Sequence, residues 1–565
     1  MFVISRRRFL VGATGMAGAV VLGACASDDD DDAGGSAASD ASTTTGAELP
    51  ERPELRLPGG DSGFPSPFAY MRGPGYIQAS YIYDTLVWKD SSGEVLPWLA
   101  RSYQASDDGL TWTFVLRDGV SWHDGTPFTA EDVVFTFEYF RGQTISPQVI
   151  VQPLPEIEEV VAGDDGTVEF RLASPLATFL EFGGVGSVPI VPRHIWSGIA
   201  DAAMERDLAV LVGTGPYRLE SYSQGEGNYL YTANDDYFLG RPFVARLENR
   251  AVGDDLSALM TGDLDVASVS GPRDEVLAPF ENDDTFELLD GPPGNAGTGL
   301  FWNLARGGAL ADVNFRRACA LAIDRQDLVD RLFGGRGQPG NPGWVPPSHP
   351  FHADVEQYPF DVDEANAMLD RAGYTRPGSG PRQGPDGQPL AFELLLANPV
   401  TPLVDLVVGS LAAIGVELGP VAIDTPTFNQ RVIAGESEMS LIGFGGMNTD
   451  HGADYLRQVY SSNTRTTQHA QGYVNPDVDR LCQEQLVTVG PDERSEIVAQ
   501  IQELIADDLP ILPLAYPDNV TIFRTGSFDR WYYTEGGVGG TVPTVNNKHA
   551  FITGEQTGLE VRPTR

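Results

Sequence analysis

The sequence predicts an α/β fold, because short alternating strands and capped amphipathic helices follow one another along most of the chain. Residues 110–116 alternate between apolar and other side chains, as expected of a half-buried strand. Residues 312–332 and 495–508 instead place apolar side chains at helical spacing. Helices and strands mixed in this way indicate layered α/β units. The apolar side chains of the first strand are Leu110, Trp112, Phe114 and Leu116.

The composition indicates a protein of several domains and argues against a nucleic-acid-binding protein. The chain has 565 residues, 41% of them hydrophobic, which is enough for several domains with sizeable cores. Its formal net charge is −42, and Lys89 and Lys548 are the only lysines. A surface this acidic repels phosphate backbones, so we expect no nucleic-acid partner. Cys319 and Cys482 form either one bridge or two buried free thiols, and their number does not decide between these.

The first 24 residues have the features of an export signal. Ser5 to Leu10 read SRRRFL, and the Gly- and Ala-rich apolar run that follows ends at Ala24. This resembles a twin-arginine signal in which Arg6 and Arg7 form the arginine pair. The run suits a signal better than a membrane-spanning helix, which needs roughly 18 or more apolar residues.

A cysteine directly follows this signal. The sequence LGAC at 22–25 resembles a lipobox, in which small residues admit the signal peptidase and the thiol of Cys25 takes the lipid. The alternative is an ordinary signal with a chance cysteine. Residues 25–49 are rich in Asp, Ser, Ala and Thr, which predicts a flexible tether. We therefore expect an extracytoplasmic lipoprotein anchored to the outer face of the cell membrane.

The first compact unit is expected over residues 81–195 and has α+β character. Two Asp-Gly pairs, at 118–119 and 124–125, predict turns that bracket a further short strand. Thr129 is expected to begin a helix, with Asp132 completing a capping box. The aromatic residues predicted to lie in the core of this unit are Trp112, Trp122 and Phe137.

Capped helices follow in the second half of the chain. Within residues 312–332, Asp324 is placed to cap the second of two helices. Asp361 begins another helix, and Gly373 stands at its C-terminal end. The Gly- and Pro-rich stretch 373–390 predicts a surface insertion.

Motifs of the common catalytic and cofactor sites are absent from the sequence. It has no Gly-Lys-Ser/Thr, no His-Glu-x-x-His, no Cys-x-x-Cys and no Gly-x-Ser-x-Gly. Gly335, Gly337 and Gly340 match Gly-x-Gly-x-x-Gly, but a proline interrupts the motif, which indicates a loop. His349 and His352 form a metal-binding or a solvated pair, and the lack of a third ligand nearby favours the solvated pair. We expect no enzymatic activity, no cofactor and no metal.

The longest resemblance to a known family lies between Tyr83 and Phe140. This stretch includes DGLTWTFVLRDGVSWHDGTPFTAEDVVFTFEYF and resembles the signature region of the family 5 extracellular solute-binding proteins, which serve oligopeptide, dipeptide and nickel importers. Four later segments extend the resemblance over residues 50–530 in the order of the family. They are GTGPY at 213–217, DVNFRRACALAIDR at 312–325, and the segments 361–374 and 510–524.

The resemblance implies a two-lobed periplasmic-binding-protein-like fold of type II, in its large peptide-binding subclass. A small extra α+β domain and a two-stranded hinge belong to this fold. The chain is expected to cross between the lobes near residues 294 and 515. The implied domains are the signal at 1–24, the tether at 25–49, lobe I at 50–80, 196–293 and 516–565, the extra domain at 81–195, and lobe II at 294–515.

The resemblance also implies a function. A lipid-anchored binding protein of an ABC importer captures a solute, most commonly a peptide, in an interlobe cleft and delivers it to a membrane permease. Oligosaccharides, nickel chelates and other small organic solutes are the alternative ligands within the family. A ligand sensor without a transporter and a lipid-anchored hydrolase are the alternative functions. We expect a monomer whose partners are the ligand and the permease subunits.

Ligand contacts are implied at the two crossings between lobes and at one loop. The alternative that Trp302 is only a core residue has equal weight. The residues implied to face the ligand are Phe301, Trp302, Asn303, Phe444, Gly445, Met447, Asp450 and Tyr516.

The loop at 444–450 reads FGGMNTD and departs from the family pattern. Peptide-binding relatives carry a W-x-x-D loop whose aspartate pairs with the ligand ammonium, and a buried ammonium without such a partner is disfavoured. Met447 stands at the anchor position and suits a partly apolar ligand surface. Asp450 is either a replacement anchor or a turn or cap residue, and Asp454 is a weaker candidate for the anchor.

Overall fold

The computed structural model describes residues 54–69, 77–89, 95–143, 157–180, 185–186, 188–291, 296–378, 380–397, 402–445, 452–464, 466–526 and 528. The predicted export signal with Arg6 and Arg7, Cys25 and the tether lie outside these residues. None of the described helices combines the length and the apolar character needed to cross a bilayer. The described strands form five sheets, and mixed α/β architecture is confirmed.

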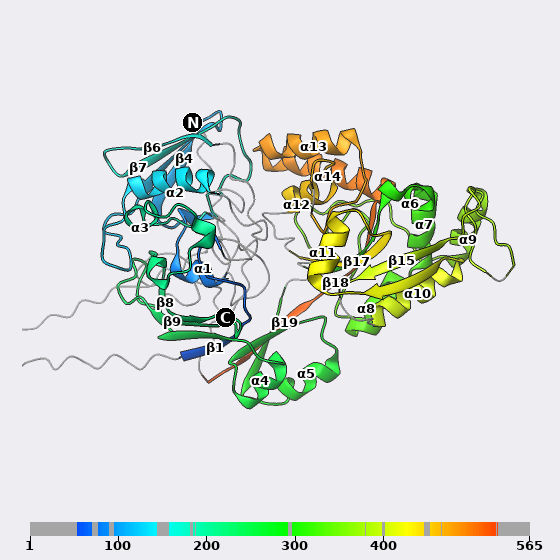
Figure 1. Cartoon of the computed structure of the whole chain (residues 1–565), viewed down its shortest axis with the longest axis horizontal. Coiled ribbons are helices and arrows are strands. Elements are labelled where there is room, and N and C mark those ends of the chain that lie inside the picture. The colour runs from blue at the N-terminus through cyan, green and yellow to red at the C-terminus, as the bar shows by residue number, and fades with distance from the viewer. Residues whose placement is uncertain are drawn as a thin grey trace, which may run out of the picture. The chain divides into compact units, whose positions relative to one another are not determined.

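A four-stranded antiparallel sheet forms the α+β unit, and helix α2 packs against it (Figure 1). The backbone N–H of Thr129 donates to Asp132 at 2.9 Å, which confirms the predicted capping box. The prediction of a short strand between the two Asp-Gly turns is wrong, since only an isolated Ser121–Pro127 bridge forms there. The elements are β4 (Ala100–Ala105), β5 (Thr111–Leu116), α2 (Ala130–Gly142), β6 (Ile157–Ala162), β7 (Thr167–Leu172) and α3 (Arg193–Trp196).

A second four-stranded sheet, in the order β1-β10-β9-β8, packs beside α1. The GTGPY segment leads into β8, and a Cβ at Gly213 would lie 1.8 Å from the carbonyl oxygen of Ile82. Only glycine allows this close approach of two backbones. The elements are β1 (Glu54–Pro58), α1 (Ile77–Ile82), β2 (Val87–Lys89), β3 (Val95–Pro97), η1 (Ala202–Met204), η2 (Leu208–Val210), β8 (Tyr217–Ser223), β9 (Asn228–Ala233) and β10 (Arg246–Arg250).

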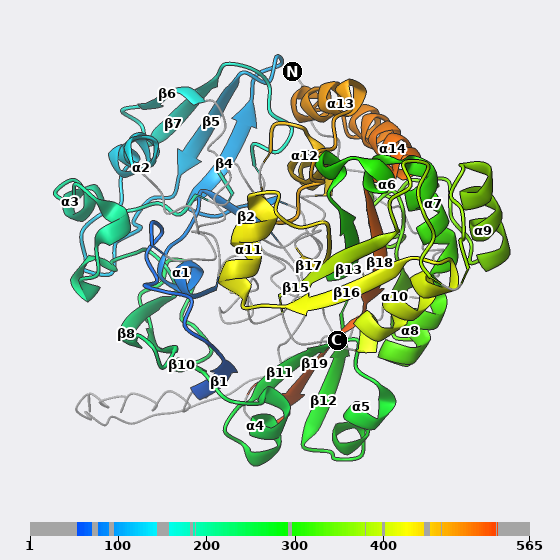
Figure 2. The ribbon, with the colours of Figure 1, turned by 45° about the vertical axis from the view of Figure 1, so that its right-hand side comes forward.

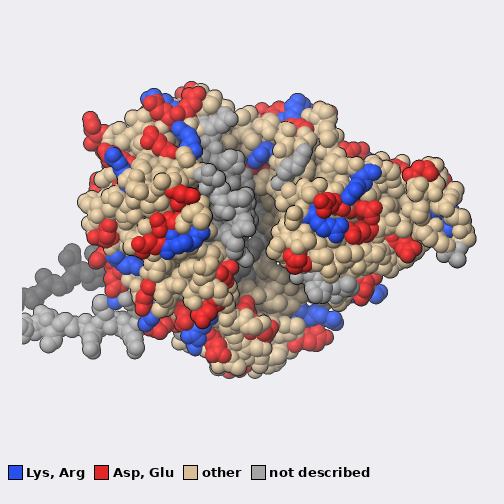
Figure 3. All heavy atoms as spheres, viewed as in Figure 1, with Lys and Arg blue, Asp and Glu red and all other residues tan. Residues whose placement is uncertain are grey.

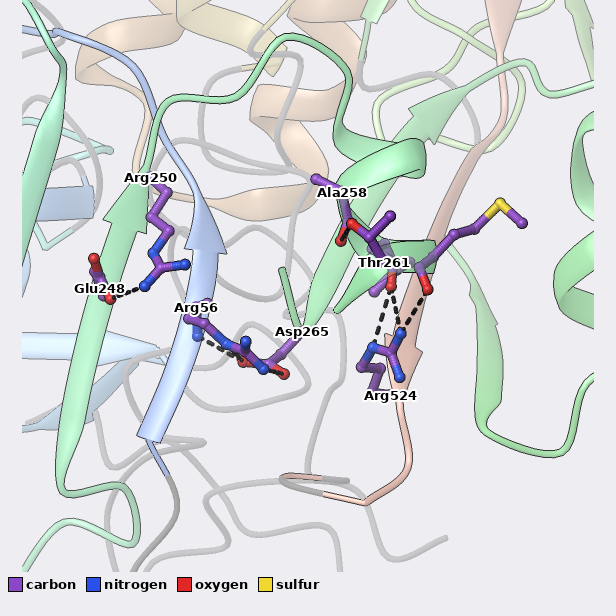
Figure 4. A network of polar contacts seen from close by, with 9 residues as sticks. Arg56, Glu248, Arg250, Ala258, Thr261, Asp265 and Arg524 are labelled. Carbon is purple, nitrogen blue, oxygen red and sulfur yellow. Dashed lines mark hydrogen bonds and ion pairs between the residues drawn. The ribbon is translucent and has the colours of Figure 1, made fainter. Parts of the chain in front are cut away.

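Helices α4 and α5 pack against a three-stranded antiparallel sheet, β11-β19-β12, and lie below it in Figure 1. Its first strand is tied to β1 through Asp265 and Arg56, which face one another in Figure 4. Asp265 accepts from the Arg56 guanidinium at 2.9 and 3.1 Å and from the Arg56 backbone N–H at 2.8 Å. The elements are α4 (Asp255–Thr261), β11 (Val266–Ser270), α5 (Asp274–Glu281), β12 (Phe286–Asp290) and β19 (Asn519–Arg524).

We expect Asp265→Asn to lower the free energy of unfolding by about 2 kcal/mol, because one buried carboxylate accepts all three bonds. The Arg56 side chain is 38% exposed, so solvent screens part of the pair. Asp274→Asn is the matched control, since Asp274 meets Arg336 at 3.2 Å with a side chain that is 82% exposed. The control should change stability by at most ~0.5 kcal/mol. Equal losses in urea unfolding of both variants would contradict this prediction.

A six-stranded mixed sheet, β14-β18-β13-β17-β15-β16, separates two groups of helices (Figure 2). Leu300, Trp302 and Leu394 point to the face covered by α7, α9 and α10. Phe301 and Leu395 point to the face covered by α11, α12, α13 and α14. Because successive strand residues alternate between faces, this sheet is buried on both sides.

The strands of this sheet are β13 (Ala296–Trp302), β14 (Gly337–Pro339), β15 (Ala391–Leu396), β16 (Glu417–Ala422), β17 (Met439–Gly445) and β18 (Ile511–Pro517). The helices around it are η3 (Leu304–Arg306), α6 (Gly308–Ala311), α7 (Val313–Ala322), α8 (Arg325–Phe333), α9 (Val362–Arg371), α10 (Pro402–Ala413), α11 (Thr425–Ile433), α12 (Gly452–Tyr460), α13 (Pro476–Val487) and α14 (Pro491–Asp508).

The predicted helix ends of this region are confirmed. Asp324 accepts from the N–H of Asp327, and Asp361 accepts from the N–H of Glu364. Gly373 follows α9 with a φ of +86°, the left-handed conformation of a C-terminal cap.

The structure also bears on three other predictions, which concern the two cysteines, the stretch 373–390 and the crossings between lobes. Cys319 and Cys482 are two buried free thiols. The stretch 373–390 is more than a surface insertion, because its Arg382 is 3% exposed and donates to Ile414 and Tyr374 carbonyl oxygens. The chain passes from the three-stranded to the six-stranded sheet between β12 and β13 and returns between β18 and β19. The domain boundaries themselves stay predictions.

Candidate functional site

An aromatic cluster lies on the face of the six-stranded sheet that α11 to α14 cover. The Trp344 ring is its centre, with the Phe444 ring centroid 4.1 Å away at an interplanar angle of 32°. The rings of Phe301 and Tyr460 meet Trp344 edge-on, with centroids at 6.1 and 5.7 Å. Phe444 in turn lies 6.0 Å from Tyr516. The cluster therefore contains three of the predicted site residues, Phe301, Phe444 and Tyr516.

A β-bulge turns Tyr516 toward this cluster. Ala515 pairs with Thr298 and Pro513 pairs with Gly299, so β18 has one residue more than β13 between these pairs. Without the extra residue, Tyr516 would share the opposite face with Leu512 and Leu514, since side chains alternate along a strand. The bulge reverses the alternation and places Tyr516 on the same face as Phe301.

The Tyr516 hydroxyl holds the loop that carries Trp344. It donates to the Trp344 carbonyl oxygen at 2.6 Å and accepts from the N–H of Asn341 at 3.4 Å. Burial raises the pKa of Tyr516, so the phenol is a neutral donor at physiological pH. Arg325 supports the same loop by donating to the Gly340 carbonyl oxygen at 2.5 Å.

Trp302 and Asn303 lie apart from the cluster. Trp302 is 1% exposed and packs on the opposite face of the sheet from Phe301. The Asn303 amide donates to the carbonyl oxygens of Gly435 and Ser437 at 3.0 and 2.8 Å. These bonds fix the turn after β13, and the predicted ligand contacts of Trp302 and Asn303 stay predictions.

Strand β17 brings Phe444 and Gly445 to the end of the sheet. Phe444 pairs with Gly297, and a Cβ on Gly297 would lie 2.5 Å from the Phe444 ring. The glycine thus leaves room for the ring over the neighbouring strand. Met447 and Asp450 follow directly, but they lie outside the described residues.

Asp454, the weaker candidate for an ammonium anchor, already has a cationic partner. It accepts from Arg457 at 2.6 and 3.2 Å and from Gln458 at 3.1 Å. The Asp454 hydrogen bond is among the causes that raise the pKa of Arg457, which stays charged. A ligand ammonium would have to compete with this guanidinium, so Asp454 is poorly suited to the role.

A metal centre has no support among the described residues, where no group of three His, Cys, Asp or Glu side chains could hold an ion. The prediction of a solvated histidine pair is wrong for His349, which is 8% exposed. Its Nδ1 accepts from the N–H of Phe351 at 3.1 Å, and the two rings stack at 5.9 Å. His352 Nδ1 lies 3.0 Å from the Val345 carbonyl oxygen and donates to it, because a carbonyl oxygen can only accept.

On one face of the molecule, charged side chains are spread rather than gathered into one patch (Figure 3). On the face drawn in Figure 3, acidic side chains are scattered and arginines lie beside many of them. Arg431 and Glu393, for example, pair at 2.7 Å between α11 and β15. The two side chains are 27% and 29% exposed, so solvent screens part of their attraction.

Trp344 is the cluster residue that the sequence does not indicate. It lies within the Gly- and Pro-rich stretch that reads as a loop, and its φ of +72° is unusual for a residue with a side chain. The signal available in the sequence was one large aromatic residue among turn formers, at 340–344. Loop position alone does not indicate burial, and Trp344 is 0% exposed.

Comparisons with known proteins extend this description. Residues 94–466 match the family described as Bacterial extracellular solute-binding proteins, family 5 Middle. Heme-binding protein A of Haemophilus influenzae is 26% identical over 478 residues, which cover 80% of this chain and 84% of that protein. The Dipeptide-binding protein of Escherichia coli is 26% identical over 495 residues, covering 81% and 88%.

Solved structures show the same fold. DppA from Helicobacter pylori, in complex with the peptide STSA, has a TM-score of 0.71 at 24% identity and covers 86% of this chain and 96% of its own. NikZ from Campylobacter jejuni, in complex with Ni(L-His), has a TM-score of 0.71 at 23% identity, covering 84% and 94%.

Proposed function

We propose that this chain, which belongs to the bacterial extracellular solute-binding proteins of family 5, is the substrate-binding component of an ABC importer. It has the two-lobed α/β fold of that family. The observation that carries the proposal is the family match over residues 94–466. The protein captures a solute between its lobes and presents it to the permease subunits in the membrane. It works as a monomer, without a cofactor, and catalyses no reaction on its ligand.

The chemistry of the aromatic cluster supports binding rather than catalysis. Its described members offer phenyl, phenol and indole groups that are packed into the core, where they set the shape of the site rather than react with a ligand. Phe301, Phe444 and Tyr516 are 4%, 3% and 0% exposed, so we propose that they shape the site from within the core. Gly445 is exposed at the end of β17 and is the proposed contact with the ligand. Trp302 and Asn303 fix the strand that follows the first crossing.

A peptide is the proposed ligand, since relatives include proteins named as dipeptide- and peptide-binding. The Asp454–Arg457 pair leaves Asp450 as the proposed partner of a peptide ammonium, and Met447 as an apolar contact. An uncharged solute is the second candidate, because the family anchor position holds methionine. Adjacent permease and ATPase genes would favour import over sensing for either ligand.

Calorimetry with the peptide Ser-Thr-Ser-Ala, free and N-acetylated, tests this proposal. We expect the free peptide to bind at least about tenfold more tightly, because a desolvated ammonium needs a carboxylate partner. Asp450→Asn should remove most of this preference. Asp354→Asn, which changes a fully exposed carboxylate, should leave it unchanged.

Three outcomes of the calorimetry would correct the proposal in different ways. A preference for the free peptide that survives Asp450→Asn shows that another residue is the anchor. Equal binding of both forms shows that the amine is not recognised. Absence of binding by either form, together with a thermal shift from a saccharide or a nickel chelate, shows a different ligand class. A ligand at 100 times its Kd stabilises the folded state by about 2.7 kcal/mol, which a melting curve resolves.

The lipid anchor has its own test. We expect Cys25→Ser to move the protein from the membrane fraction to the soluble fraction or to leave the precursor uncleaved, because the lipid is carried by the Cys25 thiol. Cys319→Ser is the control, since Cys319 is buried and burial raises its thiol pKa. Replacing Arg6 and Arg7 by lysine should block export. Membrane retention and an unchanged mass of the Cys25 variant would refute the anchor.

A further inference from the structure

We propose that Trp344 is a positioning residue for ligand binding, because its indole ring joins the end of β17 to the first turns of α12. This inference rests on the proposed function, in which Phe444 shapes the site and Gly445 at the end of β17 contacts the ligand. Trp344 itself comes from neither element. It belongs to the loop after β14, which the Tyr516 hydroxyl holds.

The ring contacts of Trp344 reach both elements. Phe444, the last but one residue of β17, lies 4.1 Å from Trp344 between ring centroids, at an angle of 32°. Tyr455, the fourth residue of α12, lies 6.2 Å away in a stacked arrangement at 30°. One indole ring thus has an aromatic neighbour on each side of the chain segment between β17 and α12. Movement of either neighbour changes the stacking with Trp344.

The backbone of Trp344 is fixed from the side of the sheet. Its N–H donates to the Asn341 carbonyl oxygen at 2.8 Å, and its own carbonyl oxygen accepts from Tyr516 at 2.6 Å. The Asn341 amide donates to the Val345 carbonyl oxygen at 2.7 Å, which closes the turn around Trp344. The bulge in β18 aims Tyr516 at this turn, so the register of the sheet determines where the indole ring lies.

Two local features of Trp344 lower the stability of the folded state. A φ of +72° is strained for a residue with a Cβ, and strain of this kind gathers at functional sites. The indole Nε1 is buried without a hydrogen-bond partner in the described part of the chain, and a buried unpaired donor is unfavourable. A phenylalanine would keep an aromatic ring at this position without the unpaired donor. The unpaired Nε1 is shared by other buried tryptophans, such as Trp196. The positive φ is specific to Trp344 among the described tryptophans, and this strain at the residue that joins the two elements indicates a role beyond core packing.

Hydrogen exchange of the full chain without ligand tests the positioning directly. We expect Trp344→Leu to raise the exchange rates of residues 444–445 and 452–460 at least about tenfold relative to wild type, as local opening becomes easier. Trp344→Phe keeps an aromatic ring and should restore most of the protection. The control is Trp196→Leu, which removes another fully buried indole that packs 4.9 Å from Phe68, far from this cluster in the sequence. It should leave the exchange of these residues unchanged.

Calorimetry with Ser-Thr-Ser-Ala separates this inference from the proposed function. We expect the Kd to rise at least tenfold in Trp344→Leu and to recover in Trp344→Phe. Equal exchange in Trp344→Leu and wild type, or an equal rise in the Trp196 variant, would overturn the positioning role. So would wild-type affinity in Trp344→Leu, while peptide binding itself would stand. If wild type binds no peptide but the exchange pattern holds, the peptide assignment fails and the role of Trp344 in ordering the two elements remains.

Discussion

Replacing Trp122 by alanine is expected to lower the free energy of unfolding by about 3–5 kcal/mol, the range for truncation of a large buried aromatic residue. Trp122 is 1% exposed and packs edge-on against Phe128 with ring centroids 5.7 Å apart. Its Nε1 donates to Asp132 at 3.4 Å, so the change also removes a partner from the capping box of α2. Urea unfolding followed by far-UV circular dichroism measures the loss.

Trp112→Ala provides the matched comparison within the same unit. The Trp112 ring lies 5.1 Å from the Phe179 ring at an interplanar angle of 39°, but Trp112 is only partly buried, less than the predicted core position implies. We expect a loss of about 2 kcal/mol, since less apolar surface is removed from contact. Peptide binding should persist in both variants at temperatures where they are folded. Loss of binding with an unchanged melting temperature would show that these tryptophans contact the ligand.

Local features of the fold could be predicted from the sequence because they depend on neighbouring residues. Thr129 with Asp132, Asp324 and Asp361 each satisfy N–H groups within three residues along the chain, so the helix starts follow from composition and spacing. The sequence also predicts that the side chains of Phe301 and Trp302, as neighbours in a strand, point to opposite faces of the sheet. Because successive strand residues face opposite sides of a sheet, this alternation favours the alternative that Trp302 is a core residue.

Long-range features of the site could not be predicted in this way. The position of Tyr516 depends on a bulge opposite Thr298 and Gly299, more than 200 residues earlier in the sequence. The burial of Trp344 depends on Phe444, Tyr455 and Tyr516, which belong to β17, α12 and β18. The pairing of Asp454 with Arg457 is local, but many acidic residues in this chain have similar spacing and only the structure singles out this pair.

His123 lies at the contact between the α+β unit and the GTGPY segment, and it gives the protein a specific pH dependence. The ring Nε2 donates to the Gly215 carbonyl oxygen at 2.9 Å, and Nδ1 accepts from the N–H of Gly213 at 3.3 Å. This arrangement needs the neutral imidazole, since a protonated Nδ1 cannot accept. The pKa of His123 is lowered from 6.5 to about 4. Burial is the main cause and the Arg218 charge adds to it, against the raising effects of the Gly215 bond, Asp84 and Asp124.

Because the pKa of His123 is lower in the folded state, the free energy of unfolding decreases as the pH falls. The unfolded chain binds a proton at His123 near pH 6.5, whereas the folded chain binds it only near pH 4. The stabilisation by neutral His123 is therefore complete above about pH 6.5 and is lost as the pH falls toward about 4. The difference corresponds to about 3 kcal/mol, at 1.36 kcal/mol for each pKa unit.

We expect His123→Gln to have a free energy of unfolding that depends less on pH than that of wild type between pH 6.5 and 4. The glutamine amide does not titrate, so about 3 kcal/mol of the pH-dependent loss should disappear, even if the variant is less stable at pH 7. Urea unfolding at half-unit pH steps measures both slopes. The carboxylates titrate in both proteins, so their contribution cancels in the comparison. His194→Gln is the control, because His194 is exposed and pairs with Asp124 at 2.7 Å. Identical slopes for wild type and His123→Gln would show that His123 is accessible to protons in the folded state, and that another group dominates the acid sensitivity of the fold.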